Sequence, residues 1–221
     1  MKIVLKIQDS FKKAADAQVA QGQRAYMKDQ FPYLGIKTTL RRELQKEAFA
    51  LQSFESEEEL LDNVSALWEL EEREYQYAAI ELLEKGRKLL TSKTLPFIEK
   101  FVRDKSWWDT VDFLAAHVTG NIIMKHPVLL NTMDLWVVGD SFWIRRTALL
   151  SQLKWKDKTD EERLFRYCTL TMHEKEFFIR KAIGWVLREY SKTNPDSVRQ
   201  FIEANKTKLS GLSYREASKY V

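Results

Sequence analysis

Apolar residues recur along almost the whole chain at steps of three and four, the spacing that places them on one face of an α-helix. Residues 1–13 show the pattern clearly, because Ile3, Val4, Ile7 and Phe11 are interspersed with lysines and predict a first amphipathic helix. No stretch alternates convincingly with a period of two, so we expect about twelve helices joined by short polar connections. The pattern therefore predicts an all-α fold.

Helix start signals divide this pattern into segments. Ser56 and Glu59 form a capping box ahead of a leucine-rich run. Further starts are predicted where a proline suits a helix's first turn or where a polar pair can cap it: Pro96, Pro127, Pro195, Asp140-Ser141 and Thr159-Asp160.

The chain also resembles itself at an interval of 35 residues. Segments 106–111, 141–146 and 176–181 each open with two adjacent aromatic residues after a polar one, and each is expected to head a helix. Segment 74–79 looks like an earlier, looser copy. Helix pairs repeating at this interval are typical of α-solenoids of the HEAT or armadillo kind. We therefore expect an α-α superhelix of HEAT-like repeats with a concave groove, forming one domain over residues 1–221.

Composition excludes several classes of protein. A single cysteine, Cys168, permits no internal disulfide, and none of the three histidines has a metal-binding spacing, so we expect neither a metal nor another cofactor. No apolar run reaches the length of a membrane span, and the N-terminus lacks a signal-peptide pattern. These features favour a cytoplasmic protein without a membrane partner.

Charge is unevenly distributed. Residues 55–84 hold eleven acidic residues against the single Arg73, whereas residues 141–195 hold twelve Lys or Arg against seven acidic residues. A polyanion would be attracted to the second region and repelled by the first, although such runs are often solvated faces.

Tryptophan placement suggests a site. Trp68 and Trp136 lie in apolar helical stripes and fit a core role. Trp107 and Trp108 cannot both face the core, because neighbouring helix residues point about 100° apart. Asp112 follows Trp108 by one helical turn in an apolar neighbourhood, where a carboxylate forms an ion pair, lies in solvent or stabilises a developing cation.

The next repeats supply possible partners for this carboxylate. Arg146 lies three residues after Trp143, on the same helix face, and Trp185 lies in the repeat after that. If equivalent helices line one side of a solenoid, these residues share that side with Trp108 and Asp112.

Six stretches resemble signature stretches of the AlkD-like DNA glycosylases, and the likeness extends over essentially the whole chain. They are residues 26–28, 31–36, 105–109, 111–112, 175–190 and 192–195. The resemblance implies that Asp112 is the catalytic carboxylate, that Trp108 and Trp185 contact the sugar, that Arg146 contacts DNA, and that Tyr26 lines the groove near the lesion.

Further DNA contacts are expected around the aromatic pairs and along the basic region. Arg145 is the alternative to Arg146, and the others are Trp107, Phe177, Phe178, Lys154, Lys156, Lys158, Arg180, Lys181 and Arg188.

The implied chemistry suits one carboxylate. A purine alkylated at N3 or N7 is positively charged and departs as a neutral base, so it needs no acid to protonate it, in contrast to the two-carboxylate scheme for ordinary glycosides. We expect a monofunctional glycosylase that acts on duplex DNA as a monomer and leaves the strand uncut. The alternative is a non-catalytic HEAT-repeat module, for which an anion in a phosphate-binding groove would be a disadvantage.

Overall fold

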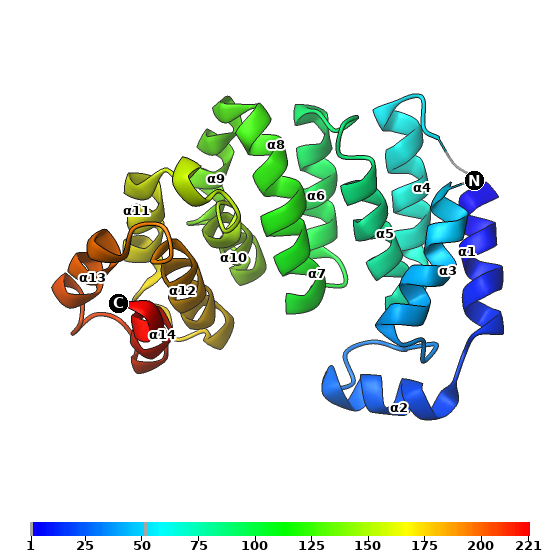
Figure 1. The fold of residues 1–221 in the computed structure, drawn as a ribbon, viewed down its shortest axis with the longest axis horizontal. Helices are drawn as coiled ribbons and strands as arrows, with labels where there is room; N and C mark the ends of the chain where they lie inside the picture. Colours follow the sequence, from blue (N-terminus) through cyan, green and yellow to red (C-terminus); the bar gives the residue numbers. More distant parts are fainter. Residues whose placement is uncertain (1, 51–52) are drawn as a thin grey trace. The chain divides into compact units, whose positions relative to one another are not determined.

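The computed structural model describes residues 2–50 and 53–221, and all regular structure in that part of the chain is helical (Figure 1). This confirms the all-α fold predicted from the apolar pattern. The chain divides into two compact units, Met1–Thr94 and Leu95–Val221. The expectation of one continuous domain over residues 1–221 stays a prediction.

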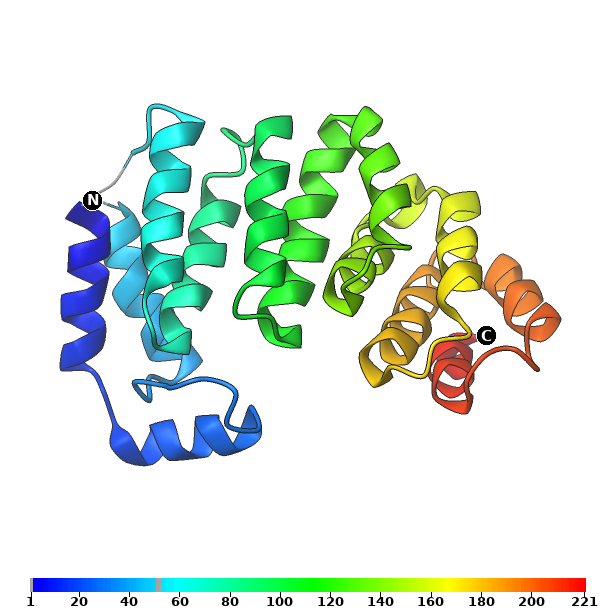
Figure 2. The same ribbon diagram turned by 180° about the vertical axis from the view of Figure 1, so that it is seen from behind.

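The first unit contains four helices that pack together and one helix that crosses the ends of two of them. Its elements are α1 (Lys2–Lys13), α2 (Ala17–Tyr26), α3 (Thr38–Ala50), α4 (Glu57–Glu69), α5 (Arg73–Lys85) and the 3-10 turn η1 (Ser92–Thr94). Helices α1, α3, α4 and α5 pack together, and the fully buried Trp68 confirms its predicted core role. Helix α2 lies across the ends of α1 and α3, as Figure 1 and Figure 2 both show.

The second unit stacks helices in sequence order. Its elements are α6 (Leu95–Arg103), α7 (Trp108–Phe113), the π-helical turn η2 (Leu114–Thr119), α8 (Gly120–Lys125), η3 (Pro127–Leu129), α9 (Leu130–Trp136), α10 (Phe142–Leu150), η4 (Lys156–Lys158), α11 (Glu161–Thr171), α12 (Phe177–Tyr190), α13 (Pro195–Ala204), α14 (Gly211–Ala217) and η5 (Ser218–Tyr220). Helix α10 packs on α7 and on α12, and α12 packs on α14. Trp136 is buried, as predicted.

The predicted repeat is visible in the helix starts. Helices α3, α5, α7, α10, α12 and α14 begin at Thr38, Arg73, Trp108, Phe142, Phe177 and Gly211, so successive starts lie 35, 35, 34, 35 and 34 residues apart. The sequence pattern identified the middle members of this series. It missed the first and the last, whose helices begin without an aromatic pair.

The predicted caps are formed at most positions. The Ser56 hydroxyl accepts a hydrogen bond from the Glu59 N–H at 3.1 Å, and the Asp160 carboxylate accepts one from the Arg163 N–H at 3.0 Å. Ser141 differs, because it precedes α10 but its side chain makes no capping hydrogen bond. Start signals thus located the helix boundaries even where the capping contact itself is absent.

The loop between α2 and α3 is fastened by a buried carboxylate. Glu74 accepts hydrogen bonds from the N–H groups of Leu34, Gly35 and Ile36 at 3.0, 2.9 and 3.1 Å. Gly35 has a φ of +90°, and a Cβ there would lie 1.9 Å from the carbonyl oxygen of Asp16, so only glycine fits. Glu74 thereby holds the loop against α5.

One helix of the second unit contains an irregular turn. Helices α7 and α8 are joined without a break by η2, where the Gly120 N–H donates to the carbonyl of Ala115, five residues earlier. The Gly120 carbonyl accepts a hydrogen bond from the Trp155 indole at 3.1 Å, and a Cβ on Gly120 would lie 2.4 Å from the Ser151 carbonyl oxygen. Glycine therefore allows this helix to approach the end of α10.

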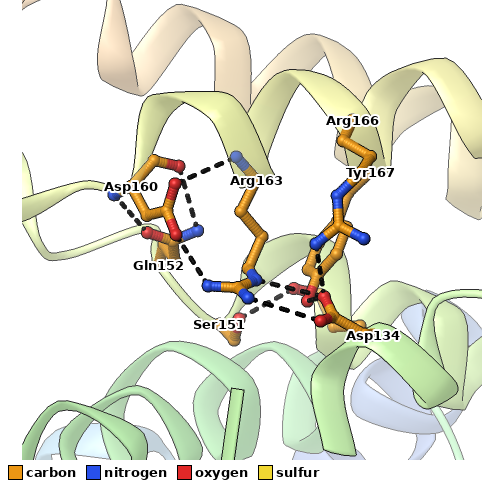
Figure 3. Close-up of polar contacts among 8 residues, drawn as sticks. Asp134, Ser151, Gln152, Asp160, Arg163, Arg166 and Tyr167 are labelled. Carbon is orange, nitrogen blue, oxygen red and sulfur yellow. Dashed lines mark hydrogen bonds and ion pairs between the residues drawn. The ribbon is translucent and has the colours of Figure 1, made fainter. Parts of the chain in front are cut away.

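Polar networks join neighbouring repeats. Figure 3 shows Asp134 of α9 facing Arg163, Arg166 and Tyr167 of α11. The Asp134 carboxylate accepts hydrogen bonds from these side chains at 3.1, 2.7 and 2.7 Å, and Arg163 also pairs with Asp160 at 2.6 Å. Among the described residues, no helix has the length and apolar character needed to cross a membrane.

Candidate functional site

Helix α7 carries Trp108 and Asp112 one turn apart, as the sequence predicted. Trp107 precedes the helix with an extended backbone, so the two adjacent tryptophans leave the chain in different directions. Both tryptophans are half-buried. Both residues therefore keep some solvent exposure at the start of the helix that carries Asp112.

The central contact of the site is an ion pair between Asp112 and Arg146. Arg146 Nε lies 2.7 Å from Asp112 Oδ1 and Arg146 Nη2 lies 2.8 Å from Asp112 Oδ2, a bidentate arrangement. The Asp112 side chain is 14% exposed and that of Arg146 only 3%. The sequence placed these residues on successive helices aligned along one side of the solenoid, and the structure brings them into direct contact.

The electrostatic environment of Asp112 contains opposing effects. Burial raises the pKa of the Asp112 carboxyl, because a charged carboxylate loses hydration there. The hydrogen bonds and charge of Arg146 act to lower this pKa, and the nearby Asp109 acts to raise it. The carboxyl thus has a raised pKa in spite of Arg146, and its ionised form depends on that arginine.

The remaining nitrogen of Arg146 connects the pair to a third helix. Arg146 Nη1 donates a hydrogen bond to the main-chain carbonyl of Phe178, at the start of α12, and the guanidinium lies 5.8 Å from the centre of the Phe178 ring. Asp112, Arg146 and Phe178 therefore tie α7, α10 and α12 together at one point.

An aromatic cluster surrounds this point. The Trp107 ring lies 5.9 Å from that of Trp143 and 5.3 Å from that of Phe178, and Phe142 stacks on Phe178 at 6.3 Å. Phe177 contacts Phe178 edge-on and is 56% exposed. The repeated aromatic pairs thus pack against one another between repeats. Trp107 and Phe178 mainly contribute to this packing, whereas Phe177 faces solvent.

Trp185 lies on α12, seven residues after Phe178, and is half-buried. Residues at this interval share a helix face, so Trp185 lies two turns along from the carbonyl that binds Arg146. That Trp185 and Trp108 contact the same sugar stays a prediction.

Arg145 has a different environment from Arg146. Its guanidinium binds both oxygens of Glu174 at 3.0 and 2.8 Å, and Nη1 donates to the carbonyls of Gly139 and Asp140 at 2.7 and 3.0 Å. The adjacent arginines thus serve two separate ion pairs, and neither guanidinium is presented to solvent as a bare cation.

The predicted phosphate-binding residues fall into two groups. Lys154, Lys156 and Lys158 are exposed. The others make intramolecular contacts: Arg180 Nε donates to the Glu174 carbonyl at 2.9 Å, Lys181 lies 2.9 Å from Glu216, and Arg188 also pairs with Glu216. The exposed lysines are therefore the ones best placed to meet a polyanion.

Glu216 was not singled out from the sequence, yet it organises the C-terminal cations. Hydrogen bonding from Lys181 and Lys219, with the charge of Arg188, lowers the pKa of the Glu216 carboxyl to about 2. A Cβ on Gly184 would lie 2.5 Å from Glu216 Cβ, so α12 and α14 approach closely here. Glu216 lies 35 residues after Lys181, and this repeat interval is the sequence signal that could have indicated their contact.

Tyr26 belongs to the first unit. It ends α2 and is 71% exposed. Its grouping with Asp112, which lies in the second unit, stays a prediction. Within the part of the chain that the structure describes, no cluster of three or more His, Cys, Asp or Glu side chains could hold a metal.

Comparisons with known proteins identify the family and the fold of this chain. A family model described as DNA alkylation repair enzyme matches residues 7–221. A solved structure described as "Predicted DNA alkylation repair enzyme from Enterococcus faecalis" shares 36% identity with this chain, with a TM-score of 0.87, over 94% of this chain and 96% of the other. No curated protein matches the chain.

More distant structures share the fold. The protein smu.31 from Streptococcus mutans UA159 is 19% identical, with a TM-score of 0.64, over 92% of this chain and 99% of its own. AlkD2 from Streptococcus mutans is 18% identical, with a TM-score of 0.63, over 91% and 99%. These likenesses support the helical-repeat architecture.

Proposed function

The chain belongs to the family of DNA alkylation repair enzymes, and from this membership we propose that it is a DNA glycosylase for purines alkylated at N3 or N7. The partner is duplex DNA containing lesions of the 3-methyladenine or 7-methylguanine type. The single observation that carries the proposal is a carboxylate, Asp112, held in a largely dehydrated position one helical turn after the half-exposed Trp108.

The proposed reaction is hydrolysis of the N-glycosidic bond. The C1′–N bond breaks and its electron pair goes to the cationic base, which leaves as a neutral molecule. The sugar becomes oxocarbenium-like, and the Asp112 carboxylate stabilises that charge more strongly than it would in bulk water. A water molecule attacks C1′ and loses its proton to Asp112 or to solvent, which leaves an abasic site and an intact strand.

The tryptophans have a separate role in this proposal. The faces of Trp108 and Trp185 hold the sugar and favour cationic character nearby, because the face of an aromatic ring is electron-rich. Both residues are half-buried and therefore combine packing against the protein with some accessible surface. Exposed lysines, Lys154, Lys156 and Lys158, supply sequence-independent contacts to phosphates.

One observation favours a second candidate function, a non-catalytic DNA-binding repeat protein. Both oxygens of Asp112 are engaged by Arg146, as in a purely structural ion pair. In that case Asp112 joins two repeats and performs no chemistry.

Product analysis separates the two candidates. A duplex with one 7-methylguanine is incubated with the protein, and free base, abasic sites and strand breaks are measured. The glycosylase releases 7-methylguanine and leaves abasic sites that break only after alkali. Binding of the duplex without base release identifies the non-catalytic protein, and a spontaneous break at the site contradicts the monofunctional mechanism.

A further inference from the structure

Arg146 stands out among the cations of the second unit because it is almost completely buried, with 3% of its side chain exposed. Two of its nitrogens bind the two oxygens of Asp112, and the third donates to the carbonyl of Phe178. Every nitrogen of the guanidinium therefore has a protein acceptor. The two remaining N–H groups, on Nη1 and Nη2, belong to a side chain that is only 3% exposed, so a DNA phosphate could reach this guanidinium only by displacing the groups that enclose it.

Displacement would be costly. Removing Arg146 from Asp112 leaves a carboxylate that is 14% exposed without its counter-ion, and unpaired buried charges are strongly destabilising. Lys154 and Lys156 are exposed instead, so a phosphate can reach them without displacing a buried counter-ion.

From this geometry we infer that Arg146 is a positioning residue that acts through Asp112 and is not a ligand of DNA phosphate. It fixes both carboxylate oxygens in one orientation, and it keeps the carboxylate ionised in a site where burial favours the neutral acid. The inference deepens the proposed function, because only an ionised Asp112 stabilises an oxocarbenium-like sugar.

The groups that set the ionisation of Asp112 come from two helices. Asp109, on α7, opposes ionisation of Asp112, and Arg146, on α10, supports it. From α12, the group in contact is the Phe178 carbonyl, which carries no charge and holds Arg146. Arg146 is thus the cation through which the carboxylate is kept charged.

The test is the pH profile of single-turnover base release by wild type, Arg146→Gln and Arg146→Lys. Without the guanidinium the pKa of Asp112 rises, and each unit of rise lowers the ionised fraction about tenfold at any pH below that pKa. Arg146→Gln should therefore release base about tenfold or more slowly than wild type on the acid limb of the profile. Its acid limb should shift to higher pH, and part of the lost rate should return as the pH is raised. Arg146→Lys should lie between the two, because lysine keeps the charge and loses the bidentate geometry.

DNA binding is measured in parallel. The dissociation constant and its salt dependence should be unchanged in Arg146→Gln within about twofold, since no phosphate contact is lost. A variant with an unshifted pH profile and a salt slope reduced by about one overturns the inference and assigns Arg146 to phosphate binding.

A matched control removes a comparable ion pair elsewhere in the unit. Arg163 pairs with Asp134 and Asp160, its side chain is 18% exposed, and Figure 3 shows it within the network between α9 and α11. Arg163→Gln should lower the stability without moving the pH profile. A shift in this control equal to that of Arg146→Gln would make the effect a general consequence of destabilisation and overturn the inference.

A second measurement stands independently of base release. The carboxyl carbon of Asp112 is titrated by NMR in aspartate-labelled wild type and in Arg146→Gln, with Asp112→Asn to assign the signal. A pKa at least about one unit higher in Arg146→Gln supports the inference even if wild type releases no base. An unchanged pKa overturns it whether or not the glycosylase proposal holds.

Discussion

Asp112 and Gly120 both face α10, although they lie eight residues apart along one continuous helix. In a regular α-helix, residues eight apart diverge by about 80°, whereas residues seven apart lie within about 20° of the same face. The π-helical turn between them holds one extra residue and removes this divergence. The turn therefore allows Asp112 to reach Arg146 while Gly120 packs on Ser151.

This relationship predicts the effect of changing the length of the turn. Deleting His117, a half-buried residue inside the turn, places Asp112 and Gly120 seven residues apart. A regular α-helix keeps residues at this interval on one face, so the contacts of Asp112 with Arg146 and of Gly120 with Ser151 are both retained. Inserting one alanine after His117 adds a step that the turn cannot absorb. Urea unfolding should show the insertion variant destabilised by about 2 kcal/mol or more relative to the deletion variant. Equal stability of the two variants would contradict the role given to the turn.

The buried carboxylate of Glu74 predicts a second effect. In Glu74→Gln, one amide oxygen replaces two carboxylate oxygens, and the amide NH2 faces the N–H groups of the loop at Leu34, Gly35 and Ile36. The loss should be about 2–3 kcal/mol, because these are buried hydrogen bonds to a charged group. Urea unfolding measures it, with the exposed Glu71→Gln as the control for the same change of charge. Similar stability of the two variants would rule out this anchoring role.

Glu216 predicts a pH dependence of stability. Its pKa is about 2 in the folded protein, against an ordinary value of 4.5, so its contribution is complete above pH 4.5 and is lost as the pH falls through about 2. Glu216→Gln should therefore be less stable than wild type by about 1–2 kcal/mol at neutral pH, with the difference shrinking between pH 4.5 and pH 2. Unfolding curves at several pH values measure this, and a difference that stays constant with pH would exclude Glu216 as its source.

Exposed lysines predict the salt dependence of DNA binding. Lys154→Ala and Lys156→Ala should each reduce the slope of log K against log salt by about one, without a preference for any DNA sequence. Arg188→Ala should reduce it less, because Arg188 is already paired with Glu216. Fluorescence anisotropy at several salt concentrations checks the order, and a larger loss for Arg188 than for the lysines would reverse it.

Much of the fold could be predicted because the signals are local. Caps and apolar spacing located the helix starts, and the aromatic pairs revealed the interval of 35 residues. Gly211 escaped notice because its helix begins without such a pair, although its distance from Phe177 fits the series. The π-helical turn was not predictable, since one extra residue scarcely changes a pattern of threes and fours.

The sequence indicated which residues form the candidate site but not how their side chains contact one another. Asp112 and Arg146 were assigned to successive helices on one side of the solenoid, yet their bidentate pairing depends on side-chain conformations that only packing determines. Glu74 belonged to an acidic run that was interpreted as a solvated, repelling face, and the structure buries it against backbone N–H groups. Charge along a sequence does not reveal which carboxylates are directed inward.

The central claim is that the Asp112 carboxylate performs the chemistry. Its most direct test is the single-turnover rate of 7-methylguanine release from a saturated duplex, comparing wild type with Asp112→Asn. Asparagine has nearly the same shape and no charge, so release should slow by at least about 100-fold while the DNA remains bound. An Asp112→Asn protein that releases the base at the wild-type rate would contradict the claim.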